Sequence, residues 1–199
     1  MRIVAIAAVT AAVMAGVAGA LAGCGSSASP PDAIGPCWPD TVGPAKGTAT
    51  LGTGRAAFED MPDMLPLEYG AQAGFDLVAN VRMSGLDPGD PASIISPTNP
   101  RTRIRAFFAD TNIPLNYDAN CPFREAYVPS ATGDYQMAMG VAIVFEICWR
   151  SDRLIGQRIR VDLELEDDTN GYTSDSKTVT AAAPSSPYPI DQDSPGCMH

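Results

Sequence analysis

Oxygen-bearing side chains gather at Glu166, Asp167, Asp168 and Asn170, with Asp175 shortly beyond. Carboxylate and amide oxygens are the ligands that Ca²⁺ prefers in proteins. Asp167, Asp168, Asn170 and Asp175 are therefore candidate ligands for a calcium ion, as in a calcium-dependent adhesion module. The stretch lacks the twelve-residue loop that ends in a bidentate glutamate. An acidic turn at the tip of a hairpin explains the same residues without a metal.

The chain has too few histidines for chemistry that depends on this residue. The chain holds one histidine, His199, at its last position, and chain ends are poor places to hold catalytic geometry. Ser-His-Asp and Cys-His catalysis are therefore not expected. A blue-copper site and a histidine-based zinc site are not expected either. The sequence indicates no cofactor.

Carboxylate chemistry remains open, because the chain has 23 acidic residues and a glycosidase needs only two of them across a cleft. Glu146 is the one carboxylate within a long apolar run, where burial would raise the pKa of its carboxyl group. More often such a residue lies on the exposed face of an edge or pairs with an arginine, for which Arg124, Arg150 and Arg153 are candidates. A carboxylate-dependent hydrolase of envelope polymers is thus an alternative function. The test is whether two carboxylates converge in a cleft with one of them buried.

The first 23 residues predict export. Arg2 precedes an uncharged run, rich in alanine and valine, that ends in small residues, which is the pattern of a secretory signal peptide. An uncleaved anchor is the alternative, since residues 3–23 could span a bilayer of ~30 Å.

The end of this run, Leu21-Ala22-Gly23-Cys24, resembles the lipobox of bacterial lipoproteins. In that family the cysteine is lipidated on its sulfur, and the signal peptide is then cleaved ahead of it. The resemblance implies lipidation of Cys24 and an extracytoplasmic protein anchored to the cell membrane or the outer membrane. Gly25, where an inner-membrane signal would be Asp, favours the outer membrane by similarity to enterobacterial sorting.

The charge of the chain bears on its partners. It carries 13 basic and 23 acidic residues, a formal net charge of −10, which repels nucleic acid and anionic lipid. We therefore expect no nucleic-acid partner, and we expect membrane attachment to come from acyl chains, of which two or more give stable anchoring.

Apart from Cys24, the chain has four cysteines, which are Cys37, Cys121, Cys148 and Cys197. An even number in an exported chain predicts two disulfides. Of the three possible pairings we favour Cys121 with Cys148, because both flank strands of the interior. Cys37 with Cys197 would then tie the two ends of the domain, and a bridge that closes so long a loop could add ~4 kcal/mol.

From Thr48 onward, apolar residues recur at every second position, which is typical of strands. The clearest strand runs from Arg158 to Glu166, and Phe75 to Ser84 alternates in the same way, with Val78 as the exception on its outer side. Asn170-Gly171 predicts a hairpin that joins 158–166 to 173–182.

Gln136 to Trp149 is apolar at nearly every position, so we expect it to be the central strand, with Met137, Met139 and the later residues of that parity inside. A helix is the alternative. The β-branched and aromatic residues and Gly140 argue against a helix.

Six to eight short strands at this spacing predict an all-β, two-sheet sandwich of immunoglobulin or fibronectin type III character. The segment Gly70-Ala71-Gln72-Ala73-Gly74 also resembles the Gly-x-Gln-Gly-Gly signature of a group of uncharacterised bacterial lipoproteins with β-sandwich domains. The resemblance covers residues 48–90, departs at Ala73 and Asp76, and implies no activity.

The expected organisation is a signal peptide (1–23), a flexible tether (24–47), the β-sandwich (48–183) and a C-terminal tail (184–199). We expect a non-enzymatic binding or structural module of the cell envelope, with an envelope protein or a polysaccharide as partner. Loops at the ends of a sandwich commonly bind, so residues 87–101 and 117–135 are the expected binding loops.

Overall fold

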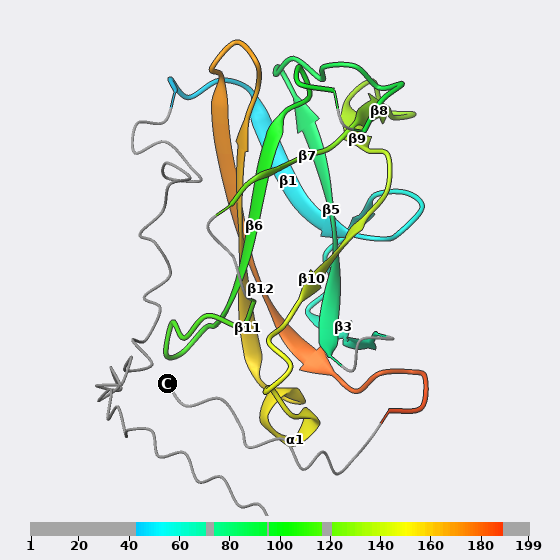
Figure 1. Ribbon diagram of the computed structural model, residues 1–199, viewed down its shortest axis with the longest axis vertical. Helices are drawn as coiled ribbons and strands as arrows, with labels where there is room; N and C mark the ends of the chain where they lie inside the picture. The colour runs from blue at the N-terminus through cyan, green and yellow to red at the C-terminus, as the bar shows by residue number, and fades with distance from the viewer. Residues whose placement is uncertain (1–42, 71–73, 95, 117–120, 189–199) are drawn as a thin grey trace, which may run out of the picture. The chain divides into compact units, whose positions relative to one another are not determined.

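A computed structural model of the chain describes residues 43–70, 74–94, 96–116 and 121–188. This part is nearly all β and forms two sheets that pack against each other (Figure 1), which confirms the all-β two-sheet sandwich. The one helix in the described residues is the single turn α1 (Ser151–Leu154).

The two sheets divide the strands unequally. The seven-stranded sheet has the order β2-β1-β5-β9-β8, with β4 and β10 also paired to β5. Its strands are β1 (Thr48–Thr53), β2 (Glu59–Asp60), β4 (Glu68–Tyr69), β5 (Phe75–Ser84), β8 (Tyr127–Pro129), β9 (Tyr135–Met137) and β10 (Val141–Val144). The five-stranded sheet has the order β3-β12-β11-β6-β7. Its strands are β3 (Met64–Pro66), β6 (Arg101–Phe108), β7 (Phe123–Arg124), β11 (Arg158–Glu166) and β12 (Tyr172–Ala182).

The predicted hairpin is confirmed. β11 and β12 pair antiparallel from Arg158 opposite Thr180 to Glu166 opposite Tyr172. Asn170 lies in the turn with a φ of 62°, a left-handed conformation that asparagine tolerates better than most residues. The inward side chains of β11 alternate with charged ones, as the sequence predicts.

The central strand of the seven-stranded sheet is β5, and the prediction that residues 136–149 form it is wrong. That stretch is broken into β9 and β10, which pair successively along one edge of β5. The break falls at Gly140, where a Cβ atom would come within 2.2 Å of the Gly54 carbonyl oxygen. The alternating pattern of burial also ends there, because Met137 is buried whereas Met139 is 60% exposed.

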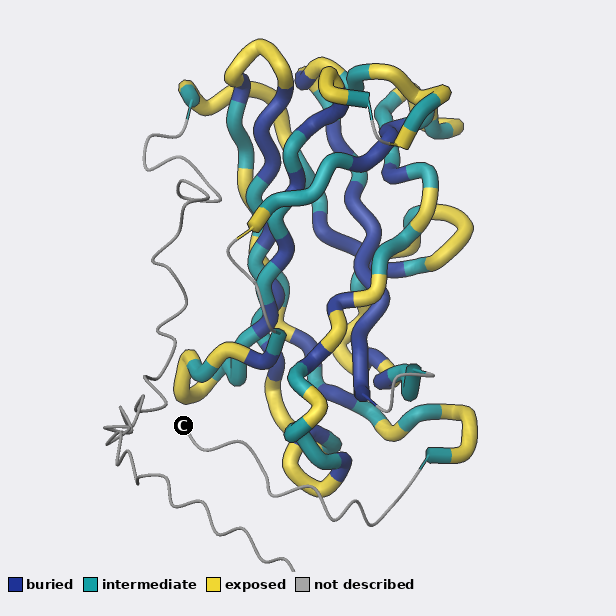
Figure 2. The backbone as a smooth tube through the Cα atoms, viewed as in Figure 1, coloured by how far each residue is buried: buried dark blue, intermediate teal, exposed yellow. Residues whose placement is uncertain are grey.

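β5 is buried on both faces along most of its length, as Figure 2 shows. Its inward residues belong to the core, as expected. Its outward residues Asp76, Val78 and Asn80 are also buried, at 6%, 6% and 0% exposure. The alternation in sequence predicts a solvent-facing side here, and that prediction is wrong because the end of β1 covers it. The Thr53 hydroxyl donates to the Val78 carbonyl, and the Asn80 amide donates to the Gly54 carbonyl.

The core lies between the sheets and is assembled from the inward side chains of both. Its largest fully buried members are Leu51, Leu67, Phe75, Leu77, Met83, Leu115, Tyr127, Met137, Phe145, Leu154, Ile159 and Leu163. Outside this core, polar and charged side chains occupy the outer face of the five-stranded sheet and the edge of β5.

Candidate functional site

The outer face of the five-stranded sheet carries a ladder of charged side chains, which we call the arginine face. It consists of Arg101, Arg103, Arg105 and Phe107 on β6; Arg158, Arg160, Asp162, Glu164 and Glu166 on β11; and Tyr172, Ser174 and Ser176 on β12. Alternation along each strand directs these side chains away from the core. The register sets Arg103 opposite Glu164, and Arg105 opposite Asp162.

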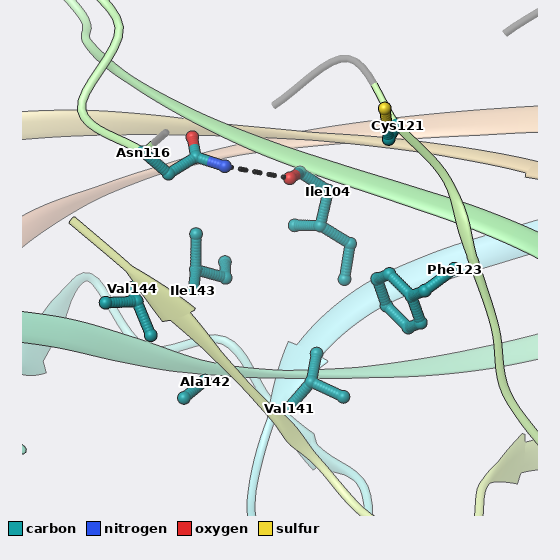
Figure 3. Close-up of a pocket in the computed structure, with 8 residues that line it drawn as sticks. All are labelled: Ile104, Asn116, Cys121, Phe123, Val141, Ala142, Ile143 and Val144. Atoms are coloured by element: carbon teal, nitrogen blue, oxygen red, sulfur yellow. Dashed lines mark hydrogen bonds between the residues drawn. The ribbon is translucent and has the colours of Figure 1, made fainter. Parts of the chain in front are cut away.

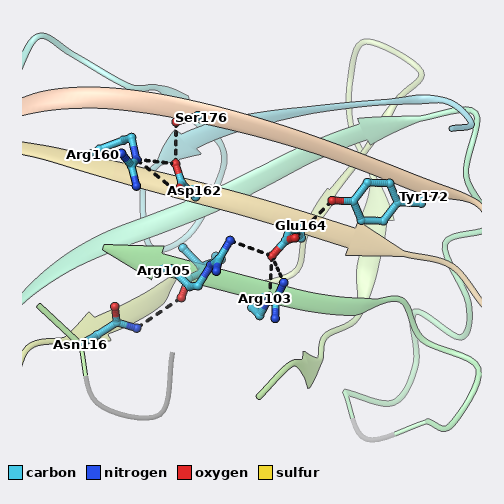
Figure 4. Close-up of polar contacts among 9 residues, drawn as sticks. Arg103, Arg105, Asn116, Arg160, Asp162, Glu164, Tyr172 and Ser176 are labelled. Atoms are coloured by element: carbon cyan, nitrogen blue, oxygen red, sulfur yellow. Dashed lines mark hydrogen bonds and ion pairs between the residues drawn. The ribbon is translucent and has the colours of Figure 1, made fainter. Parts of the chain in front are cut away.

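Ion pairs cross the strands of this face (Figure 4). Glu164 pairs with Arg103, and its Oε2 lies 3.2 Å from Nη2 of Arg105. Arg160 Nε donates to Asp162 Oδ1 at 3.0 Å, and the Ser176 hydroxyl donates to the same oxygen at 2.7 Å. The Arg103 and Glu164 side chains are only 12% and 15% exposed, so the ladder is held in a fixed geometry.

A polar hollow of about 430 Å³ opens on the arginine face, between β11, β12 and Arg105. The Tyr172 hydroxyl donates to Glu164 Oε1 at 3.3 Å, and burial together with that carboxylate raises the pKa of Tyr172. Arg105 Nε is buried and has no hydrogen-bond partner among the described residues. The lining of the hollow therefore combines fixed donors, acceptors and hydroxyls.

A second concavity of about 290 Å³ lies between β6 and β10, where the two sheets approach (Figure 3). It is lined by Ile104, Asn116, Cys121, Phe123 and residues 141–144. The Asn116 amide is used by the backbone of β6, accepting from Ala106 N and donating to the Ile104 carbonyl. The rest of this groove is largely apolar.

A third concavity, the β5 cleft, has a volume of about 350 Å³ and lies between the β1–β2 connection and β3–β4. Arg55 and Glu68 form an ion pair on its wall, and Asp76 lies directly opposite Glu68 in the β4–β5 register. Burial, and to a lesser extent Glu68, raises the pKa of Asp76 to about 6, and Arg55 opposes this shift. Two carboxylates thus approach each other with one of them buried.

The calcium candidates do not form one site. Asp167 Oδ1 accepts hydrogen bonds from Thr169 N, Thr169 Oγ1 and Gly171 N, and its Oδ2 accepts from Asp87 N. Burial opposes its ionisation, yet these bonds and Lys46 together lower the pKa of Asp167 to about 2. Asp167 therefore organises the hairpin turn.

The other calcium candidates lie apart from these oxygens. Asp175 Oδ2 accepts from Leu51 N, on β1 of the other sheet, and Asp168 and Asn170 are exposed at the tip. Within the described residues, no group of three His, Cys, Asp or Glu side chains is placed to hold a metal ion.

Only two of the five cysteines lie within the described residues. Cys24, Cys37 and Cys197 lie outside the described residues. Cys121 lies directly before β7 beside the groove between the sheets, and Cys148 follows β10. The lipidation of Cys24 and both disulfide pairings remain predictions.

The loop expected at 87–101 is largely exposed, and among its described residues only Asn99 and Pro100 are buried. Asn99 is fully buried, accepts from Asp90 N at 2.8 Å and donates to the Ser93 carbonyl at 2.6 Å. The second expected loop, 117–135, contains residues 117–120, which lie outside the described part, and includes β7 and β8. Glu146 lies just after β10, half-buried, and its amide donates to the Leu115 carbonyl.

Sequence reasoning did not single out the arginine face or the β5 cleft. A signal for the arginine face is present, because arginines alternate at 101, 103 and 105 and again at 158 and 160. The cleft has no local signal, since Glu68 and Asp76 meet only through the pairing of β4 with β5.

No family model, no curated protein and no solved structure matches this chain. The immunoglobulin or fibronectin type III character of the sandwich therefore stays a prediction. Within the described part of the chain, no helix has the length and apolar character needed to cross a bilayer.

Proposed function

We propose that this chain is a lipid-anchored protein of the cell envelope whose β-sandwich binds a polysaccharide, without catalysis, across the arginine face. The lipobox resemblance at Cys24 supports the anchor and the extracytoplasmic location. The observation that supports polysaccharide binding is the polar hollow on paired strands, which is lined by arginine, carboxylate, tyrosine and serine side chains.

The chemistry of the arginine face suits a polymer rich in hydroxyl groups. Arginines donate, carboxylates accept, and the serine and tyrosine hydroxyls do both. Groups carried on paired strands are positioned more exactly than groups on loops, so less ordering is needed when a ligand binds.

The charge of this face favours an acidic polymer. Five arginines stand against three carboxylates on the outward positions of β6 and β11, within a chain of net charge −10. The hollow itself is lined by Arg105 with Asp162, Glu164 and Asp175, so the excess of arginines surrounds it. A local basic surface attracts an anionic polymer, and this attraction weakens as salt rises.

Hydrolysis is the less favoured function. Glu68 and Asp76 do approach each other with one of them buried. However, Arg55 Nε lies 3.3 and 3.2 Å from the two oxygens of Glu68, so Glu68 is engaged by an arginine. We therefore propose binding, with turnover as a measured alternative.

Affinity electrophoresis through gels that contain acidic envelope polysaccharide tests this function. Wild-type protein is expected to be retarded, and Arg105→Gln to lose most of the retardation. Lys177→Gln is the matched control. Lys177 lies on β12 at a position that alternates with those of the arginine face. Its replacement removes one positive charge, as Arg105→Gln does. Equal retardation of both variants, no retardation of the wild type, or shortened polymer after incubation would contradict the proposal.

A further inference from the structure

The β5 cleft occupies a gap in strand pairing. On one edge of β5, β1 pairs with residues 80–84 and β4 pairs with residues 75–76. The residues between them, around Val78, face the cleft, whose walls come from Thr53 to Arg55, Glu59 and Asp60 on one side and from Pro62 and Leu65 to Glu68 on the other.

The cleft is acidic. Glu59, Asp60 and Glu68 line it, Asp76 lies beside Glu68, and Arg55 is the single basic residue among its lining residues. Arg55 forms an ion pair with Glu68 through Nε and Nη2, and its side chain is 55% exposed. A concentration of one sign of charge in a concave site attracts ions of the opposite sign.

Asp76 supplies an independent reason to expect a ligand. Its side chain is 8% exposed, and its Oδ1 has no hydrogen-bond partner among the described residues. Arg55 Nη2 lies 4.0 Å from Oδ1, beyond hydrogen-bond distance. A buried carboxylate oxygen without a hydrogen bond is costly, and a donor with positive charge would relieve that cost.

Part of the cleft wall is apolar. Pro62, Leu65, Pro66 and Val78 line the cleft next to Glu68. A charged group on an aliphatic stem matches this arrangement, because such a stem packs along apolar surface while its charged end reaches polar partners.

We propose that the β5 cleft binds a primary ammonium group on an aliphatic chain, as in the side chain of a lysine-containing peptide. The ammonium lies between Glu68 and Asp76 and donates to Asp76 Oδ1, and the stem lies over Val78. Arg55, which is exposed and shared between both carboxylates, swings aside on binding. The site shares no lining residue with the polar hollow of the arginine face and does not depend on polysaccharide binding.

Ligand-observed NMR on the full mature chain in detergent tests this site, with Nα-acetyl-lysine-N-methylamide as the probe. The probe is expected to bind at pH 7.5, and its Nε-acetylated form to bind at least about tenfold more weakly, since one lost charged contact of ~1.4 kcal/mol has that effect. Equal binding of both forms, or binding of Ca²⁺ in preference to the amine, would overturn the proposal.

Three variants assign the binding to this cleft. Asp76→Asn is expected to raise the Kd of the probe by about tenfold, while Asp168→Asn, an equal charge change at an exposed position, leaves the Kd unchanged. Arg55→Gln removes the competing cation and is expected to lower the Kd at pH 8. A purely structural role of Asp76 would not produce tighter binding in Arg55→Gln, so weaker or unchanged binding in that variant contradicts the proposal.

Discussion

Two buried aspartates of this chain lie in opposite surroundings. Asp167 accepts five hydrogen bonds and ion-pair contacts from backbone and side-chain donors. Asp76 has one oxygen without any hydrogen bond in the described part of the chain. Donors stabilise the charged form of a carboxylate and burial alone destabilises it. The same residue type therefore stabilises the hairpin turn at one position and remains an open acceptor at the other.

Asp76→Asn is expected to change how stability depends on pH. The folded-state pKa of about 6 lies above the ordinary 3.8, so the folded state binds the proton more tightly. The wild type has this contribution in full below pH 4 and loses it as the pH rises through 6. Asp76→Asn should gain up to about 3 kcal/mol over the wild type between pH 4 and pH 7, as measured by urea unfolding.

Glu68 and Arg55 face Asp76 from β4 and from the β1–β2 connection, so each would alter this pH profile. Asp168→Asn, at an exposed position, is the control and should follow the wild type. A constant difference between Asp76→Asn and the wild type over the whole pH range would contradict the assigned pKa.

Asp167→Asn is expected to have the reverse profile. Its folded-state pKa of about 2 lies below the ordinary 3.8, so its contribution is present above pH 4 and is lost as the pH falls through 2. The variant should be less stable than the wild type by about 2 kcal/mol at pH 7, and the two should converge in acid. Chemical unfolding at pH 7 and pH 2.5 measures both values, and a loss of stability that is equal at both would count against this account.

At the scale of elements, Gly140 separates β9 from β10 and lets both pair with β5. A Cβ atom there would come within 2.2 Å of Gly54 O and 3.1 Å of Ala79 O. Gly140→Ala is therefore expected to destabilise the fold by about 1–3 kcal/mol through overpacking.

Gly74→Ala is the matched control for that variant. A Cβ at Gly74 would meet its nearest neighbour, Phe145 O, at an ordinary 3.6 Å, so its effect should be smaller. Thermal unfolding of the two variants gives the comparison, and equal melting temperatures would show that Gly140 is not a point of close approach.

The sequence predicts those elements whose pattern is local. β5, β11 and the β11–β12 hairpin follow from alternation and from Asn170-Gly171, and the structure confirms them. The break at Gly140 does not follow, because it depends on contact with Gly54, far away in the chain. The burial of Asp76 and Asn80 is missed for the same reason, since the end of β1 covers positions that alternation assigns to solvent.

At the scale of the whole molecule, we expect two disulfides among Cys37, Cys121, Cys148 and Cys197. Partners in a disulfide need Cα atoms within about 7 Å, and the positions of three of the five cysteines lie outside the described residues. Mass spectrometry of alkylated, unreduced protein should find none of these four thiols free. Peptide mapping would then test the favoured pairs, Cys121 with Cys148 and Cys37 with Cys197, and a free thiol at any of the four would contradict the prediction.

We propose a domain held at a membrane surface, with an arginine-rich polar face on the five-stranded sheet and an acidic cleft beside β5 and β3. Both surfaces are carried on strands of a sandwich that the core holds rigid. The proposed binding function requires that this domain be displayed in the envelope, and the anchor at Cys24 is the premise for that display.

Metabolic labelling with a clickable fatty acid tests the anchor most directly. Full-length wild-type protein and Cys24→Ala would be expressed in a bacterium with lipoprotein processing, and the label on each would be compared at equal protein. We predict label on the wild type and none on Cys24→Ala. Equal label on both, or no label on the wild type, would contradict a lipid-anchored protein of the envelope.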